Sequence, residues 1–158
     1  MPTAIGDVVP ALTAAIDAAL PGVKVYHGPK PTSEQPSEFV TVAFDPEGVG
    51  DGVNTEQTAA AVGNLWVSES GDVTCSITCW TGNGTADTLL QRADDLYDLI
   101  DVALRADRYL GGVLVAGASD DINGARAFGH GGWSPRSTDT GIVGRLTFTV
   151  RYATLLTA

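Results

Sequence analysis

The chain has 158 residues, of which 44% are hydrophobic, and its 19 acidic residues outnumber 9 lysines and arginines to give a net charge of −10. This length predicts one domain that buries roughly 70% of its unfolded surface and folds without a metal or a disulfide. The negative charge disfavours binding to phosphate backbones and to anionic membranes, because both kinds of binding depend on cationic side chains.

The N-terminal part of the chain predicts one helix and two strands. Apolar residues recur at helical spacing over residues 5–20, with Asp7 as the expected N-cap and the Pro21–Gly22 pair as the stop. Alternating residues then predict short strands at 23–28 and 38–45, which a proline-rich segment connects.

An acidic loop is expected near residues 45–58, where the sequence PEGVGDGVNTEQT is rich in glycine. Its acidic residues suggest calcium, but their spacing differs from that of an EF-hand, and we interpret the segment as a mobile, solvated loop. A strand is expected from Ala59 to Val67, and the sequence SESGD is expected to turn the chain after it. The candidate partner contacts in the acidic loop are Asp45, Glu47, Asp51 and Glu56.

The chain's two cysteines lie four residues apart in VTCSITCW, residues 73–80. The β-branched residues around them favour a strand, in which Cys75 and Cys79 share one face. Their Cα atoms are then separated by about 13 Å, whereas a disulfide tolerates at most about 7 Å. Zinc would need further ligands, and the two histidines, His27 and His130, each stand alone. We therefore interpret both cysteines as buried free thiols.

A second helix is expected at residues 86–105, with Thr85 as its N-cap. Apolar residues form one stripe along it, and acidic residues fall on the opposite side, where no lysine at i+4 relieves their repulsion. A solvated face is the ordinary interpretation of such a stripe, and a negative contact surface is the alternative. The acidic residues of this candidate bore or solvent face are Asp87, Asp94, Asp98 and Asp101.

The last third of the chain predicts three strands and a second loop. Strands are expected at 113–118 and 121–129, and a long final strand at 144–155, where apolar and polar residues alternate. The intervening sequence GHGGWSPRSTDTG, residues 129–141, predicts a flexible loop and lacks the G-K-[ST] of a phosphate-binding loop. The candidate partner contacts in this loop are His130, Arg136 and Trp133, the last as an anchor for a partner's pocket.

Strands outnumber helices and do not alternate with them regularly, so the sequence predicts a single α+β domain over residues 1–158. We expect a largely antiparallel or mixed β-sheet packed by the two main helices. No apolar run approaches the roughly 20 residues that span a bilayer, and the N-terminus lacks a basic signal-peptide region, so a soluble protein is expected. The sequence contains no G-x-S-x-G motif, and GASDD is the nearest string. No catalytic residue, metal or cofactor is therefore expected.

The order of these elements resembles that of the tail terminator, or tail completion, proteins of long-tailed phages, especially those that infect actinobacteria. The similar stretches span nearly the whole chain: the N-terminal helix, PGVKVYHGPKP, EFVTVAF, VTCSITCW, the helix Leu89–Leu104 with DRYLGG, and GRLTFTVRYAT. The loops at 45–57 and 129–141 have no counterpart in the family pattern. Their expected role as axial contacts with tube and neck is inferred from this sequence alone.

The resemblance implies a structural virion protein that forms a hexameric ring, caps the tail tube, ends its polymerisation and offers a docking surface to the neck. The implied partners are copies of itself, the major tail tube protein and a neck or head-closure protein, in a tail that is assembled in the host cytoplasm. Genomic DNA would pass without specific binding, because about sixty negative charges on six copies repel it. A head-closure or neck protein is one alternative, and a small ligand-binding or hydrolase domain that uses His130 is another.

Overall fold

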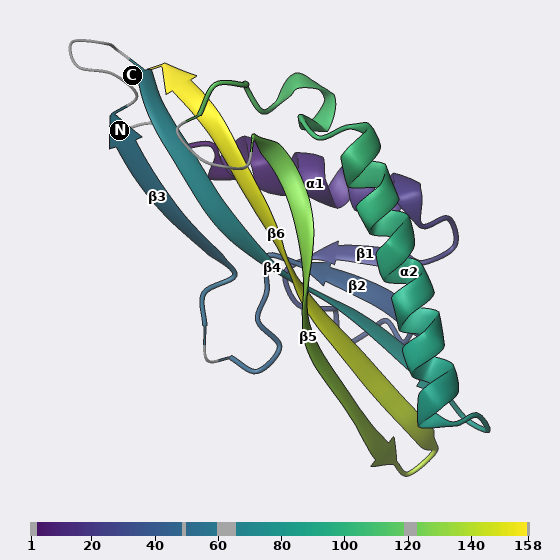
Figure 1. Cartoon of the computed structure of the whole chain (residues 1–158). Coiled ribbons are helices and arrows are strands. Elements are labelled where there is room, and N and C mark those ends of the chain that lie inside the picture. Colours follow the sequence, from purple (N-terminus) through teal and green to yellow (C-terminus); the bar gives the residue numbers. More distant parts are fainter. Residues whose placement is uncertain (1–2, 49, 60–65, 119–122, 158) are drawn as a thin grey trace.

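The computed structural model describes residues 3–48, 50–59, 66–118 and 123–157. Two helices, six strands and one 3-10 turn occur in this part of the chain (Figure 1). None of the described helices is both long enough and apolar enough to cross a membrane. The elements are α1 Ile5–Ala19, β1 Lys24–His27, β2 Glu38–Val42, β3 Val53–Ala59, β4 Trp66–Thr81, α2 Ala86–Ala106, η1 Leu110–Gly112, β5 Gly124–Thr138 and β6 Gly141–Thr157.

All six strands belong to one mixed sheet, in the order β1-β2-β4-β6-β5 with β3 also paired to β4. Neighbouring strands are antiparallel except for the parallel pair β1 and β2. The central strands β4 and β6 pair along their whole shared length, from Trp66 opposite Thr157 to Thr81 opposite Ile142. The predicted α+β fold with a largely antiparallel sheet is confirmed.

β2 and β3 follow one another along the same edge of β4. The register of β2 ends opposite Cys75, and that of β3 begins opposite Val73. The chain between the two strands leaves the sheet, and both ends of this excursion bind Thr74. Phe44 donates its N–H to the Thr74 carbonyl oxygen at 3.3 Å, and the Thr74 N–H donates to the Gly52 carbonyl oxygen at 2.9 Å. β2 and β3 are therefore one strand interrupted by a loop.

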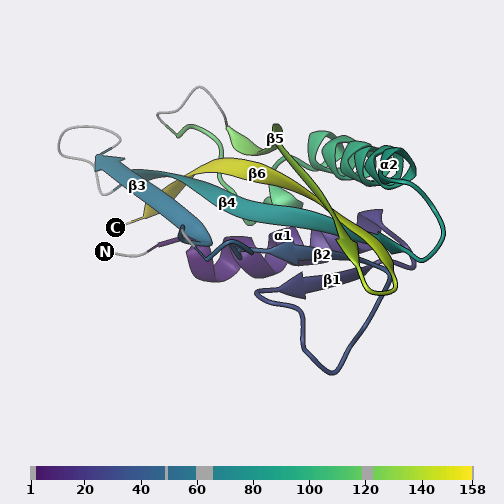
Figure 2. The same cartoon turned by 90° about the horizontal axis from the view of Figure 1, so that it is seen from below.

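Both helices pack on one face of the sheet. Strand alternation sends every second residue toward them, and the β4 residues of that face are fully buried: Val73, Cys75, Ile77 and Cys79. α1 lies beside β1 and β2, and α2 packs on β4, β5 and β6. One hydrophobic core joins the two helices to the sheet. Figure 2 shows α2 on one side of the strands and the segment that follows β1 on the other.

The two helices differ in how well their starts were predicted. Thr85 caps α2 as expected, since its Oγ1 accepts the N–H of Thr88 at 3.3 Å. In α1 the N-cap is Ala4, and the predicted cap Asp7 lies in the first turn. A tertiary contact explains the difference. The carboxylate of Glu69, on β4, accepts the Ala4 N–H at 3.0 Å and so caps the start of the helix in place of a local side chain.

The segment 129–141, predicted as a flexible loop, is a strand for most of its length. β5 continues through it to Thr138 and pairs with β6. A β-bulge accommodates the extra residues of this stretch. Phe128 lies opposite Thr149, but Gly132, four residues later, lies opposite Thr147, only two residues away on β6. The long partner strand supplies backbone hydrogen bonds on both sides of this bulge. Pairing thereby outweighs the local turn preference of glycine and serine.

Strands also replace two other predicted irregular stretches. β3 occupies Val53–Ala59 inside the predicted loop 45–58, and β4 runs without a turn through SESGD, residues 68–72. Every residue of the SESGD stretch pairs with β3 on one side and with β6 on the other. Two neighbouring strands therefore supply partners that a sequence-based turn prediction does not take into account.

The strands predicted between residues 59 and 129 agree only partly with the structure. The strand expected at Ala59–Val67 falls mainly on 60–65, outside the described residues, and the one expected at 121–129 begins at Gly124. The strand predicted at 113–118 is absent from the described elements, because Gly112 and Gly117 take φ angles of 94° and 101°, which bend the chain.

Candidate functional site

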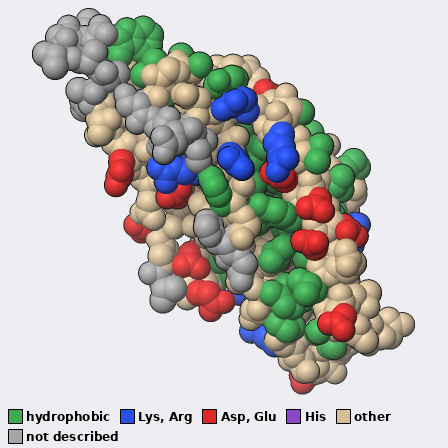
Figure 3. All heavy atoms as spheres, in the orientation of Figure 1, with side chains coloured by type: hydrophobic (Ala, Val, Ile, Leu, Met, Phe, Trp, Pro, Cys, Tyr) green, Lys and Arg blue, Asp and Glu red, His purple; other side chains and the backbone are tan. Residues whose placement is uncertain are grey.

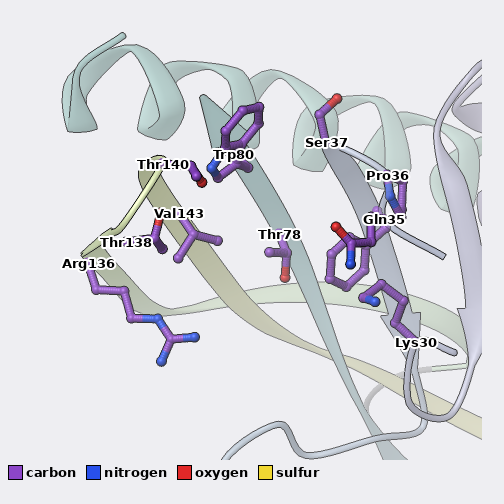
Figure 4. A pocket seen from close by; sticks show the side chains of 11 residues that line it. Lys30, Gln35, Pro36, Ser37, Thr78, Trp80, Arg136, Thr138, Thr140 and Val143 are labelled. Atoms are coloured by element: carbon purple, nitrogen blue, oxygen red, sulfur yellow. The ribbon is translucent and has the colours of Figure 1, made fainter. Parts of the chain in front are cut away.

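The sheet face opposite the helices is only partly covered, and a groove crosses it. The main hollow measures about 710 Å³ and lies between the segment after β1 and the β5–β6 hairpin (Figure 4). Two smaller hollows, of about 380 and 210 Å³, share lining residues with it. We call this surface the open-face groove. Its main lining side chains are Lys30, Phe39, Thr78, Trp80, Arg136, Val143 and Arg145.

The floor of the open-face groove is polar and its walls are partly apolar. The hydroxyl groups of Thr41 and Ser76 are buried and lie 2.7 Å apart across β2 and β4, so they satisfy each other. Phe39 and Val143 add apolar surface on either side. Trp80, at the end of β4, is 41% exposed. The floor is thus satisfied within the chain, whereas the Trp80 ring is available to a partner.

Three cationic side chains border the groove, but they differ in what they already bind. Arg145 on β6 forms an ion pair with Glu47 at 3.0 Å. Lys30 donates to two backbone carbonyl groups of its own segment, at 3.0 and 2.6 Å. Arg136 on β5 is exposed, and none of the ion pairs among the described residues involves it. The groove is therefore a positive surface on a chain whose net charge is −10.

The four acidic contacts predicted in the first loop do not come together. Asp45 points inward and closes the loop, since its carboxylate accepts the N–H groups of Glu47 at 3.0 Å and Gly50 at 2.7 Å. Glu47 pairs with an arginine of β6. Asp51 and Glu56 are exposed, and Glu56 lies on β3. Within the described ranges, no three His, Cys, Asp or Glu side chains gather as a metal site.

The three contacts predicted in the second loop lie on β5. Arg136 lies at the groove, whereas the side chain of His130 is outside the described part of the structure. Trp133 is half-buried and packs against the core. Its ring lies directly over Gly144, where a Cβ atom would come within 2.2 Å of it. Trp133 is therefore occupied within its own chain, and Trp80, which the sequence analysis did not select, is the exposed tryptophan of the groove.

The acidic face of α2 is on the surface, as predicted. Its exposed members are Asp87, Asp94, Asp95 and Asp98. Asp95, which the sequence analysis did not single out, accepts a hydrogen bond from Gln91 at 3.2 Å. Asp101 is half-buried and pairs with Arg105 at 2.9 Å, an i,i+4 contact that was also missed. Figure 3 shows the acidic side chains along the side of the molecule where α2 lies.

Glu69 is a buried carboxylate that the sequence analysis did not recognise. It is fully buried and accepts hydrogen bonds from Tyr152 Oη at 2.8 Å, Gln57 Nε2 at 2.6 Å, the Ala4 N–H at 3.0 Å and Thr3 Oγ1 at 3.3 Å. Burial and this hydrogen bond raise the pKa of Tyr152. The network joins α1, β3, β4 and β6, and it is structural because no solvent reaches the carboxylate.

The two thiols are free and buried, as predicted. Burial raises the pKa of Cys75 to about 12 and that of Cys79 to about 11. Both are therefore protonated at neutral pH, and a buried protonated thiol is a poor nucleophile and a poor metal ligand.

Comparison with protein-family models and with the curated proteins found no match to this chain.

Proposed function

We propose that this protein is a structural subunit of a long-tailed phage: copies form a ring that caps the tail tube, ends its polymerisation and docks the neck. The observation that carries the proposal is the open-face groove, a hollowed sheet face with an exposed tryptophan and cationic side chains. A face of this kind suits contact with another protein, because aromatic and arginine side chains contribute most to protein interfaces.

The shape of the subunit also supports assembly. β1 and β5 are the outermost strands of the sheet order, so their outer edges have no partner among the described strands. The turn of the β5–β6 hairpin lies at one end of the molecule, beside the end of β4 (Figure 1). Free edges and an exposed hairpin turn are features through which copies can meet head to tail, and such contacts form a ring when their rotation closes.

The charge of the chain supports the proposed position at a DNA-conducting end of the tail. A ring of subunits with a net charge of −10 each has an acidic surface overall. Such a surface repels DNA at distances up to about a Debye length, roughly 8 Å at physiological salt. DNA could then move through the opening without adhering to it.

The experiment that tests the proposal uses the purified chain with and without the major tail tube protein. We expect light scattering to give a mass of several subunits, and negative-stain images to show rings and tubes that stop growing when the chain is added. A chain that stays monomeric in both mixtures and leaves tube length unchanged would overturn the proposal. Binding to a portal adaptor but not to the tube subunit would overturn the tail position and favour a neck protein.

A further inference from the structure

This subunit has two surfaces of opposite charge, which lie on opposite sides of the sheet. The cationic open-face groove lies on the side without helices. The acidic face of α2 lies on the other side, since α2 packs on the opposite sheet face (Figure 2). A molecule with complementary charges on two opposite sides carries both halves of a head-to-tail contact between copies of itself.

The positive side of this pair has two cations whose charge is not met by a carboxylate of the groove. Among the described residues, Lys30 binds only backbone carbonyl groups and the ring of Phe39, 5.9 Å away, and Arg136 is in no ion pair. The acidic groups nearby are engaged or lie outside the lining. Glu47 pairs with Arg145, and Glu38 pairs with Arg92.

Two further acidic residues lie close to the groove. The carboxylate of Glu34 accepts a hydrogen bond from Tyr26. Asp139, in the β5–β6 turn, is exposed and is not among the lining residues. The apolar surface of Trp80 and Val143 lies beside the cations. The groove therefore fits an occupant with carboxylates next to an apolar side chain.

The acidic face of α2 has this composition. Asp94, Asp98 and Val102 are spaced by four residues, so they form one row about 12 Å long on the helix surface. All three are exposed, and Val102 is 64% exposed. No ion pair among the described residues involves either aspartate, and like charges at i,i+4 destabilise a helix. A cationic partner surface would relieve that repulsion.

We propose that the open-face groove of one subunit receives the acidic face of α2 from a second copy of this chain. The cations of the groove attract the row of Asp94 and Asp98, and Val102 meets the apolar surface of Trp80 and Val143. The proposal rests on the ring function proposed above and names the contact that builds the ring. It assigns Asp94 and Asp98 to a contact between subunits in place of the bore or solvent face expected from the sequence.

The basic residues at the other end of α2 are a poorer match for this acidic face. Arg105 already pairs with Asp101, and Arg108 donates to the Asn123 carbonyl oxygen at 3.0 and 2.6 Å. Their positive charge is therefore already partly used within the chain, unlike that of Arg136. The groove, with two cations in no ion pair among the described residues, is the better match.

Charge reversal with complementation tests the contact. One variant carries Lys30→Glu and Arg136→Glu in the groove, and the other carries Asp94→Lys and Asp98→Lys on α2. Each variant alone should associate about tenfold or more weakly than the wild type, because like charges then face each other. An equimolar mixture should assemble again, since each groove meets an α2 of opposite charge in an alternating ring. Sedimentation velocity and negative-stain images measure both effects.

Matched controls separate this contact from a general effect of charge. Lys24→Glu with Arg126→Glu gives the same charge change as the groove variant. For α2, Asp98→Lys alone is compared with Asp17→Lys, which makes the same charge change at an exposed position of α1. Both controls should assemble as the wild type does. Circular dichroism and thermal unfolding verify folding, and Arg136→Glu alone replaces the double variant if Lys30→Glu unfolds the segment after β1.

The outcomes distinguish the contact from the proposed function. If the wild type forms rings and both charge-reversed variants do so equally well, the contact is wrong and the ring function stands. If the variants dissociate but their mixture does not assemble, the pairing of groove with α2 is wrong. If the wild type never assembles, even with tube protein, the function itself is wrong.

Discussion

At the scale of single residues, the fold depends on a few buried side chains whose importance is not evident from the residue type. Glu69 is the clearest, because four donors from the N-terminal segment and two strands converge on one buried carboxylate. A carboxylate in the core is costly to bury unless hydrogen bonds satisfy it, and here they do. The stability of the N-terminal helix is thereby linked to the centre of the sheet.

Glu69→Ala should lower the free energy of unfolding by about 2–4 kcal/mol, because buried donors lose their acceptor and a cavity remains. Tyr152→Phe removes only one donor and should cost about 1 kcal/mol. Glu56→Ala, at an exposed position of β3, is the matched control and should change stability by at most about 0.5 kcal/mol. Urea unfolding measures all three, and an equal effect of the two glutamate variants would contradict the role assigned to Glu69.

The buried thiol of Cys75 predicts a loss of stability at alkaline pH. Its pKa is raised from 9.0 to about 12 in the folded protein, so the folded state holds the proton more tightly than the unfolded state does. The resulting stabilisation is complete below pH 9 and is lost as the pH rises toward 12.

Between pH 8 and pH 10, the fall in unfolding free energy should be about 1 kcal/mol smaller in Cys75→Ala than in the wild type. Urea titrations at both pH values measure this difference. The raised pKa of Tyr152 acts in the same direction above pH 10, so the comparison ends there. Parallel pH profiles of the two proteins would show that the thiol is not the group responsible.

At the scale of elements, the β5–β6 hairpin is held by an aromatic ring over a glycine. Trp133 of β5 covers Gly144 of β6, and a Cβ atom at Gly144 would approach the ring to 2.2 Å. The same arrangement recurs between β4 and β6, where a Cβ atom at Gly71 would meet the Tyr152 ring at 2.5 Å. These glycines are required for packing and not for turns.

Gly144→Ala should therefore destabilise the protein by about 1–3 kcal/mol, since the ring must shift from its packed position. Gly132→Ala is the control in the same hairpin, because its Cβ would meet Thr147 at an ordinary contact distance of 3.7 Å. Thermal unfolding compares the two. A Gly144→Ala protein as stable as the control would show that Trp133 yields without cost.

The elements that could be predicted well from the sequence are those whose structure follows from their own residues. α2 shows a complete apolar stripe and a capping threonine, and the alternation around Cys75 fixes the buried face of β4. The wrong predictions lie in stretches whose structure depends on pairing with another strand. The glycine- and serine-rich stretches of β4 and β5 become strands only because β6 lies beside them, and a single sequence does not reveal that neighbour.

The candidate site shows the same limit. The acidic face of α2 follows from helical periodicity, and so it could be predicted. The groove gathers Lys30, Trp80 and Arg136 from three distant parts of the chain, and their meeting depends on the strand order. Only Arg136 among them was selected, and for a loop that is in fact a strand. A tryptophan at the end of a strand was the signal that could have pointed to this surface.

At the scale of the whole molecule, one core joins both helices to the sheet, so the described parts should unfold together. Far-UV circular dichroism, which reports on the helices, and tryptophan fluorescence, which includes Trp133 in the packed hairpin, should give coincident transitions in urea. Two separate midpoints would mean that the chain contains more than one cooperative unit, against the single domain expected from its length.

The attachment of the loop after β2 has a consequence for how this fold tolerates change. Phe44 and Gly52 both form backbone hydrogen bonds with Thr74. The two ends of the loop are therefore fixed to the same residue of β4, and this attachment does not depend on the length of the chain between them. Residues can be gained or lost there without displacing β3 along its neighbour, and adding residues to a surface loop costs little entropy. The position is a natural entry point for a peptide tag that leaves the strand register unchanged.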